Sequence, residues 1–592
     1  MRELEYPFDS ELIQQNRRKL KKALLADGST RLKKNIAVLG GSTTHDIIAA
    51  LELFLLNQGI EPAFYESEYA QFYQDAMFGN EELDNFHPDI IFIHTSLRNV
   101  NVGFPQMSDS KEQVDRLIDD QLAFFTGMWE KLKAKFNCPI IQNNFEMPFY
   151  RLLGNKDAVD YRGRTNFAGR LNQRFYDYAD AHSDFYIHDI NYISAAYGLE
   201  KWSDPFYWYM YKYCLCVPAI PEFAFDLANI IKAIFGKNKK ALVLDLDNTL
   251  WSGVVGDDGV DGIDVGQETS VGQGFYEFQS YLKAHKQLGI LLNVASKNDH
   301  ENAIAGLNHP SGVLRPEDFT IIKANWDAKS ENIKKIASEL ALLPESLVFV
   351  DDNPAEREIV RAYVPGVAVP EVNKVEEYIH RIDRGGYFEV TSFSADDASR
   401  VEMYRQNIMR AQAQESFTDY NEYLLSLDMH ADIKDFEPVY LARITQLTNK
   451  SNQFNLTTKR FTESEMEATA ADPQYVRLYG RLTDKFGDNG IVSVVIGRQD
   501  DKLLHMELWL MSCRVLKRDM EQAMLDELVR VAAARGVEEI RGYYYPTAKN
   551  KMVEKLYEIF GFTLVSADEA GNTVWSLKTA GYENQNRVIK VN

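Results

Sequence analysis

The sequence predicts a multidomain α/β protein in which two regions built on parallel sheets precede a region with a mainly antiparallel sheet. With 592 residues, the chain is long enough for roughly three or four domains. Strand-like apolar runs alternate with amphipathic segments in the first two regions, as they do in parallel α/β sheets. In the third region apolar and polar residues alternate, which is typical of antiparallel strands. We expect domains at residues 1–234, 235–378 and 379–580, followed by a tail at 581–592.

The first region is expected to contain a polar helical arm and then strands alternating with helices. NIAVLGGSTTHDIIAALELFLLNQGI (35–60) combines a strand with an amphipathic segment, and PDIIFIHTS (88–96) supplies another strand. Two further strand-like runs, CPIIQNNF (138–145) and DFYIHDIN (184–191), extend the sheet. A helical segment at 222–240 then leads into the second region.

The second region is expected to form a doubly wound parallel sheet without a large cap domain. About fifty residues separate Asp245 from Ser296 and about thirty separate Ser296 from Lys329, which leaves no room for a substantial cap in either gap. Ligands of such sheets bind beyond the carboxyl ends of the strands. The strand-like runs are KALVLDLD (240–247), ILLNVASKND (290–299), FTIIKANW (319–326) and SLVFVDDNP (346–354).

The third region begins where the composition shifts, at RIDRGGYFEVTSFS (381–394). The run NGIVSVVIGRQDDKLLHMELWLM (489–511) alternates like antiparallel strands, and a helix is expected at 519–536.

Composition and charge argue against several classes of function. The net charge is −22, from 87 acidic and 65 basic residues, which argues against a general nucleic-acid-binding protein. No apolar run reaches about 18 residues, and the first ten residues lack the features of an export signal, so we expect neither a membrane span nor secretion. The four cysteines follow neither zinc nor dense disulfide spacing, which favours a reducing, cytoplasmic setting.

Two aspartates lie one residue apart at the end of an apolar strand-like run. In a strand, Asp245 and Asp247 would lie on the same face, and carboxylates that close require a cation or shared protons. We expect Mg²⁺ to be held there by Asp245, the backbone carbonyl of Asp247, and Asp351 or Asp352.

The polar residues at these strand ends suit phosphoryl transfer. Asp245 could attack phosphorus to give an aspartyl phosphate, and Asp247 could protonate the leaving group and later activate water. Ser296, at the end of a strand, and Lys329, at the start of a helix, could hold the phosphoryl oxygens.

DxDxT after an apolar run, followed in order by a serine, a lysine and an acidic pair, resembles the haloacid dehalogenase (HAD) superfamily of phosphatases. The resemblance adds Thr249 to the expected phosphate-binding residues. Lys323 is the alternative for the lysine. We favour Lys329 because its helix start and its spacing before Asp351 are more similar to the third motif of that superfamily.

Longer strings, LDLDNTLWSGVVGDDG (244–259), ASKND (295–299) and FVDDNPAEREIVR (349–361), resemble the FkbH-like proteins. This resemblance implies a HAD-type phosphatase domain fused to an acyltransferase domain of the GNAT type. It also implies that a glyceryl unit is loaded from 1,3-bisphosphoglycerate onto the phosphopantetheine thiol of an acyl carrier protein, with loss of phosphate. Further similar strings are TNKSNQFNLTTKR (448–460), DKFGDNGIVSVVI (484–496), LWLMSCRVLKRD (508–519) and YPTAKNKMVEKLYEIFGF (545–562).

Cys513 matches the acyl-accepting cysteine proposed for that family. A thiol directly before a helix N-terminus has its thiolate favoured, which supports the assignment independently. The alternative is a small buried core residue. The residues expected around the acyl group and pantetheine are Arg514, Lys517, Arg518, Asn550 and Tyr557.

The loop RVLKRD (514–519) departs from the GNAT pattern, in which small residues bring backbone N–H groups to the pyrophosphate of coenzyme A. Lys517 and Asp519 replace the two small residues, which counts against coenzyme A as a cofactor. Lys517 and Arg518 could instead attract a phosphopantetheine phosphate or an acidic carrier protein. Packing and capping remain the alternative for Asn550 and Tyr557.

VLGGSTTHDI (38–47), with Ser42 after a strand, resembles the first block of the SGNH hydrolases, as does the upstream domain of longer FkbH-like proteins. The expected Asp-x-x-His occurs only as DPFY (204–207), with Tyr207 in the place of the histidine base. We therefore interpret the first domain as degenerate, serving binding or scaffolding. His45, His94 and His188 are interpreted as structural, with a relocated triad as the alternative.

Two functions remain as hypotheses. The preferred one is a Mg²⁺-dependent glyceryl transferase that acts on a phosphorylated three-carbon donor and passes the acyl group through Cys513 to a carrier protein. The other is a Mg²⁺-dependent phosphatase of a small metabolite or sugar phosphate, with the flanking domains as cap or scaffold. A non-enzymatic interaction protein is a distant third.

Overall fold

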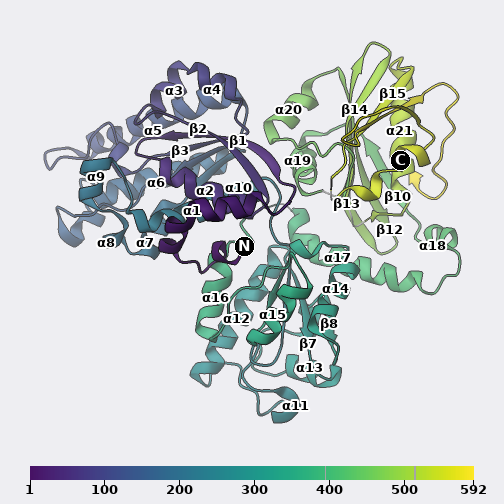
Figure 1. Cartoon of the computed structure of the whole chain (residues 1–592), viewed down its shortest axis with the longest axis horizontal. Coiled ribbons are helices and arrows are strands. Elements are labelled where there is room, and N and C mark those ends of the chain that lie inside the picture. Colours follow the sequence, from purple (N-terminus) through teal and green to yellow (C-terminus); the bar gives the residue numbers. More distant parts are fainter. Residues whose placement is uncertain (394, 452, 513–514, 548) are drawn as a thin grey trace. The chain divides into compact units, whose positions relative to one another are not determined.

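The computed structural model describes residues 1–393, 395–451, 453–512, 515–547 and 549–592 (Figure 1). By their internal contacts, the described residues form two compact units. One unit contains residues 1–234 with 462–465, and the other contains residues 235–461 with 466–592. The parallel sheets predicted for the first two regions therefore belong to different units.

Residues 1–234, which are described without a gap, form a five-stranded parallel sheet in the order β2-β1-β3-β4-β5. The prediction of a parallel α/β first region is confirmed. Every residue of β3 and β4 is buried, because both faces of these central strands are covered, and this explains their continuous apolar runs. The strands are β1 (Leu32–Gly40), β2 (Ile60–Glu66), β3 (Ile90–His94), β4 (Ile140–Asn143) and β5 (Phe185–His188).

The longest helix of this unit, α5 (Lys111–Phe136), begins with a capping motif and packs its apolar face into the core. Ser110 starts α5 with a capping box, in which its hydroxyl accepts from the Gln113 N–H and the Gln113 side chain accepts from the Ser110 N–H. The apolar face of α5 then buries Phe125 and Trp129 in the core. The helices are α1 (Ser10–Leu25), α2 (His45–Asn57), α3 (Phe72–Phe78), α4 (Glu81–Phe86), α5 (Lys111–Phe136), α6 (Arg164–Ala181), α7 (Ile190–Tyr197), α8 (Leu199–Trp202), α9 (Pro205–Tyr211) and α10 (Ile220–Ile234).

Residues 235–393, also described without a gap, contain a four-stranded parallel sheet in the order β8-β7-β6-β9. The chain runs from β6 outward to β7 and β8 and then returns to β9 on the other side of β6. This reversal next to β6 makes a topological switch point, where ligands of such sheets bind. The strands are β6 (Ala241–Leu244), β7 (Leu291–Ser296), β8 (Ile321–Ala324) and β9 (Leu347–Val350).

The strand β6 ends at Leu244, three residues before the expected end. Asp245 and Asp247 therefore lie in the loop beyond the strand and not on one face of it. The surrounding helices are α11 (Val255–Asp258), α12 (Ser270–Gln287), α13 (His300–Leu307), α14 (Lys329–Glu339), α15 (Pro354–Tyr363) and α16 (Val375–Arg384).

The described residues beyond 394 form a nine-stranded sheet that is mainly antiparallel, as predicted. Parallel pairing occurs between β14 and β15 and between β10 and β18. The strands are β10 (His430–Lys434), β11 (Phe454–Asn455), β12 (Tyr475–Asp484), β13 (Gly487–Asp500), β14 (Leu503–Met511), β15 (Glu539–Tyr544), β16 (Thr563–Ala567), β17 (Thr573–Lys578) and β18 (Lys590–Val591). The helices are α17 (Ala395–Gln414), α18 (Tyr420–Ser426), α19 (Leu441–Lys450), α20 (Glu463–Ala471), α21 (Met520–Ala534) and α22 (Leu556–Ile559).

In the part of the chain that the structure describes, no helix is both long and apolar enough to cross a membrane.

Candidate active site

Three carboxylates meet at the carboxyl ends of the neighbouring strands β6 and β9. Asp245 follows β6, and Asp351 and Asp352 follow β9. One oxygen atom from each lies within 4.8 Å of the others. Asp245 and Asp351 are buried and Asp352 is partly buried. The strand order therefore gathers in space acidic residues that are about a hundred positions apart in the sequence.

Lys329, the first residue of α14, lies against two of these carboxylates. Its Nζ atom is 2.8 Å from Asp245 Oδ2 and 2.6 Å from Asp351 Oδ2, and the residue is only 4% exposed. Burial disfavours the charged ammonium, but the two carboxylates outweigh burial and raise the pKa of Lys329. Lys323, the alternative lysine, pairs instead with Glu339 at 2.6 Å.

The cluster has more negative charge than Lys329 can balance. Burial, and then the charge of Asp245, raise the pKa of Asp351 to about 6. Burial likewise raises the pKa of Asp352. The Oδ1 atom of Asp245 is buried and has no hydrogen-bond partner among the residues that the structure describes. Three crowded carboxylates with a spare buried oxygen fit a hard divalent cation such as Mg²⁺, which prefers oxygen ligands.

Asp247 is held by three donors. Its Oδ1 accepts from the Trp251 indole N–H at 2.9 Å and the Val255 N–H at 3.0 Å, and its Oδ2 accepts from the Asn298 amide at 3.0 Å. Burial raises the pKa of Asp247, which favours a role as proton donor. Trp251 and Asn298 were not expected as site residues, although both lie inside quoted motifs.

The two remaining residues of the expected phosphate site are both buried. Thr249 links the two acidic loops, because its Oγ1 accepts from the Asp352 N–H at 3.2 Å and lies 3.4 Å from Asp352 Oδ1. Ser296 is the last residue of β7, the other neighbour of β6. Tyr378 also contacts the loop after Asp247, because its hydroxyl donates to the Asn248 carbonyl at 3.0 Å.

Comparison with known proteins agrees with this geometry. Residues 35–232 match the family model for the FkbH N-terminal domain. The N-terminal part of the protein BF1531 from Bacteroides fragilis, which contains a phosphatase domain and was crystallised in complex with Mg, is similar over 64% of this chain and 99% of its own length. The two share 31% sequence identity, with a TM-score of 0.59. The chain belongs to the same family as BF1531.

Other similarities are weaker. The ribosomal-protein-S18-alanine N-acetyltransferase from Escherichia coli has 14% identity over 26% of this chain and 99% of its own, with a TM-score of 0.21. A GNAT-family acetyltransferase from Streptococcus pneumoniae has 16% identity over 25% of this chain and 99% of its own, also with a TM-score of 0.21. TM-scores this low do not establish a common fold. No curated protein matches the chain.

The residues expected to bind the acyl group lie in the C-terminal region of this family member. Cys513 and Arg514 fall outside the described residues. Lys517 and Asp519 have φ angles of +64° and +61°. This left-handed backbone favours glycine, so the loop adopts the conformation of a glycine-containing turn although larger residues occupy both positions.

Arg518, Asn550 and Tyr557 are all buried. The Arg518 guanidinium donates to Asn407 Oδ1 at 2.8 Å, and burial lowers its pKa to about 10. Asn550 donates to the carbonyls of Asn455 and Tyr545, each at 2.9 Å. Tyr557 packs in the core of the C-terminal sheet. For Asn550 and Tyr557 these contacts are those of the packing and capping alternative, and ligand binding by the three residues stays a prediction.

Polar side chains also gather at the carboxyl edge of the first sheet, where they form a buried chain. Ser42 Oγ lies 3.4 Å from Cys214 Sγ, which lies 3.2 Å from His94 Nε2. His94 Nδ1 is 2.8 Å from the Asn143 amide nitrogen, and the Asn143 oxygen is 3.1 Å from His188 Nδ1. The expected histidine position, Tyr207, lies on α9.

Asn143 determines which nitrogen of His94 carries the proton. The Asn143 amide nitrogen donates to the Thr95 carbonyl at 3.1 Å, which fixes the orientation of the amide. The same nitrogen therefore donates to His94 Nδ1, and the proton of neutral His94 resides on Nε2, facing Cys214. Burial lowers the pKa of His94 to about 3 and raises that of Cys214 to about 12. Both groups are neutral at pH 7, and His94 donates a hydrogen bond to the thiol without accepting its proton. This arrangement disfavours a relocated triad.

Proposed function

We propose that this protein is a Mg²⁺-dependent phosphoryl-transfer enzyme of the phosphatase type, with its active site at the carboxyl edge of the sheet β8-β7-β6-β9. The observation that carries the proposal is the cluster of Asp245, Asp351 and Asp352, with oxygens within 4.8 Å of one another and Lys329 beside it. The relationship to BF1531, whose phosphatase domain is complexed with Mg, supports the same metal.

Asp245, Asp351 and Asp352 would hold the ion, which when bound neutralises the crowded carboxylates and the charge of an incoming phosphate. Asp245 attacks phosphorus, and the bond from phosphorus to the leaving oxygen breaks as the aspartyl phosphate forms. Asp247 donates its proton to the leaving oxygen. It then takes a proton from the water that attacks the aspartyl phosphate, so that inorganic phosphate is released and Asp245 is regenerated.

Lys329 and Ser296 assist this reaction from the ends of α14 and β7. The ammonium of Lys329 lies between Asp245 and Asp351 and weakens the repulsion between the two carboxylates. It would also donate hydrogen bonds to the phosphoryl oxygens, whose charge it offsets. Ser296 would contribute a hydroxyl donor to the same oxygens.

The fuller proposal is glyceryl transfer. The Cys513 thiol would attack the acyl carbon of a phosphorylated three-carbon donor similar to 1,3-bisphosphoglycerate, and the bond from that carbon to the acyl-phosphate oxygen would break with release of phosphate. Asp245 would remove the other phosphate from its ester oxygen, and the glyceryl group would pass by thioester exchange from Cys513 to the phosphopantetheine of an acyl carrier protein. Membership of the family of BF1531, the match of residues 35–232 to the FkbH N-terminal domain and the string LWLMSCRVLKRD support this proposal.

The second candidate is a Mg²⁺-dependent phosphatase of a small metabolite or sugar phosphate. It is favoured by the burial of Arg518, Asn550 and Tyr557, three of the residues expected around a pantetheine arm. In this case the flanking regions serve as cap or scaffold, and Cys513 is dispensable.

One experiment separates the two candidates. The protein is incubated with Mg²⁺ and 1,3-bisphosphoglycerate generated in place, and intact mass and peptide maps are recorded alongside phosphate release. A hydroxylamine-labile glyceryl adduct on Cys513, absent from a Cys513→Ser variant, supports glyceryl transfer. Phosphate release without an adduct supports the phosphatase. If Asp245→Asn releases phosphate as fast as the unmodified protein, the proposed site is wrong.

A further inference from the structure

Arg357 lies five residues after the acidic pair, on α15, and contacts the backbone of both acidic residues. Its Nη1 atom donates to the carbonyl oxygens of Asp351 and Asp352, each at 2.8 Å, and to that of Val372 at 2.7 Å. The residue is only 2% exposed. These three carbonyls satisfy Nη1 of the buried guanidinium, whereas its Nε has no partner among the described residues.

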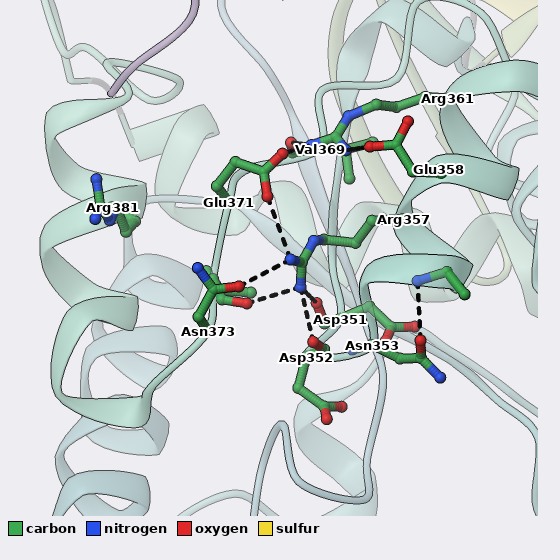
Figure 2. Close-up of polar contacts among 12 residues, drawn as sticks. Asp351, Asp352, Asn353, Arg357, Glu358, Arg361, Val369, Glu371, Asn373 and Arg381 are labelled. Carbon is green, nitrogen blue, oxygen red and sulfur yellow. Dashed lines mark hydrogen bonds and ion pairs between the residues drawn. The ribbon is translucent and has the colours of Figure 1, made fainter. Parts of the chain in front are cut away.

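The other end of the guanidinium is held by the segment that leads into α16. Nη2 donates to Glu371 Oε2 at 3.2 Å and to Asn373 Oδ1 at 3.0 Å. Figure 2 shows Arg357 between these two side chains and the backbone of the acidic loop. One planar group thus ties the loop after β9 to residues 371–373.

We propose that Arg357 is a positioning residue that sets the Mg²⁺ affinity of the site by fixing the loop that carries Asp351 and Asp352. The inference rests on the proposed function, because it assumes that these carboxylates hold the ion. Two carbonyls that point at one nitrogen fix the peptide planes on either side of Asp352, and the peptide planes determine where the two carboxylates point.

Lysine cannot replace arginine in this role. A lysine ammonium has a shorter reach and no second nitrogen to bind Glu371 and Asn373 while the first binds the two carbonyls. Groups that hydrogen-bond to metal-binding residues orient those residues. The loss of such a group typically weakens metal binding by about 10- to 100-fold.

Arg361, one turn further along α15, provides a matched control (Figure 2). It shares Glu371 with Arg357, at 2.7 Å, and donates to the Val369 carbonyl at 2.6 Å. The described contacts of Arg361 include neither Asp351 nor Asp352. Its removal perturbs the same helix and the same acidic partner without releasing the loop.

The experiment is titration calorimetry of Mg²⁺ into the full-length protein and into Arg357→Lys, Arg357→Met and Arg361→Met variants. Unfolding temperatures of the same preparations without metal show whether each variant is folded. We expect Mg²⁺ binding to weaken by about 10- to 100-fold in both Arg357 variants. Binding to Arg361→Met should keep the affinity of the unmodified protein, even if its unfolding temperature falls.

Two results would overturn the inference. One is a folded Arg357→Lys variant that binds Mg²⁺ as tightly as the unmodified protein, and the other is an equal loss of affinity in Arg361→Met. The proposed function fails separately, if the unmodified protein binds Mg²⁺ but releases phosphate from no donor. In that case the change in affinity on substitution of Arg357 still decides whether Arg357 positions a metal site.

Discussion

The carboxyl edges of the two parallel sheets have similar topology but differ in charge. At β6 and β9, three carboxylates meet and Lys329 pairs with two of them, while a buried oxygen of Asp245 has no hydrogen-bond partner in the described parts of the chain. At β3, β4 and β5, His94, Asn143 and His188 form a chain of hydrogen bonds with Cys214 at one end. At the first edge, the negative charge of the carboxylates exceeds the positive charge of Lys329. At the second edge, Cys214 and His94 are both neutral.

The difference shows that position at a sheet edge does not by itself make an active site. Reaction requires a group that can give or take a proton or bind a ligand, and the cluster at Asp245 and Asp351 has such groups because its charge is unbalanced. At the other edge, the Asn143 amide donates a hydrogen bond to His94 Nδ1, the nitrogen that would otherwise accept a proton. Changes at one edge should therefore affect catalysis, and changes at the other should affect only stability.

The largest effect is expected for Asp245→Asn, which removes the nucleophile. Phosphate release with Mg²⁺ should fall by roughly 10⁴-fold or more, because the amide of asparagine is a much weaker nucleophile than a carboxylate. Ser42→Ala, at the edge of the first sheet, is the control and should release phosphate at an unchanged rate. Loss of phosphate release in Ser42→Ala would show that the two edges are not separate.

The next effect concerns His94 and pH. Burial holds the pKa of His94 at about 3, below its ordinary value near 6.5, so the folded state favours neutral His94. The resulting stability is complete above pH 6.5 and is lost as the pH falls toward 3, by up to about 5 kcal/mol. Protection factors of peptides from β3 to β5, which correct for the slower intrinsic exchange in acid, should therefore fall at low pH in the unmodified protein more than in His94→Gln.

The comparison must be made between these two proteins, because Glu146 acts in the opposite sense. Its burial raises its pKa to about 7, so its contribution is present at low pH and is lost as the pH rises through that value. An equal response to acid in both proteins would show that His94 is not the group responsible.

Lys329→Met should destabilise the unit that contains β6 in the absence of metal. Asp245 and Asp351 would then be buried without a cation, which typically costs about 3–5 kcal/mol. Urea unfolding with and without Mg²⁺ measures the effect, and the ion should stabilise the variant more than the unmodified protein. Lys323→Met removes a partly exposed ion pair and should cost less than about 1 kcal/mol. Similar losses in the two variants would contradict the assignment of Lys329.

The smallest effect is expected for Asn298→Ala. Its amide donates to Asp247 and stabilises the ionised carboxylate, so its removal should raise the pKa of Asp247 and lower kcat by about tenfold. The limb of the pH–rate profile that reports Asp247 should move to higher pH. Asn325→Ala is the control, because the described hydrogen bonds of the Asn325 side chain include Asn332 and do not include Asp247. An unshifted limb in Asn298→Ala would mean that Asp247 is not the titrating group.

Much of the fold could be predicted because its signals are local. The continuous apolar runs of β3 and β6 and the alternation along β13 depend on neighbouring residues alone, and each indicated the correct kind of sheet. The end of β6 was placed three residues too late, since nothing in LDLD marks where pairing with β9 stops.

The candidate site could be predicted only in part. The motif pattern singled out Asp245, Asp351 and Lys329, which the fold brings together. Arg357 and Asn298 were missed although both lie inside recognised strings, because their importance depends on contacts with a distant carbonyl or carboxylate. For the same reason the burial of Arg518 could not be predicted from its neighbours in the sequence.

The sequence by itself determined the order of strands and helices and the acidic, basic and hydroxyl residues that end the strands, because these follow from the periodicity of neighbouring residues. Only the tertiary structure decided which of these groups meet. The order β7-β6-β9 places Asp245 beside Asp351 and Lys329, and the pairing of β3 with β4 gives His94 a partner in Asn143. Charge balance and proton position depend on distances of a few ångströms between residues far apart in the chain, and those distances are set by packing.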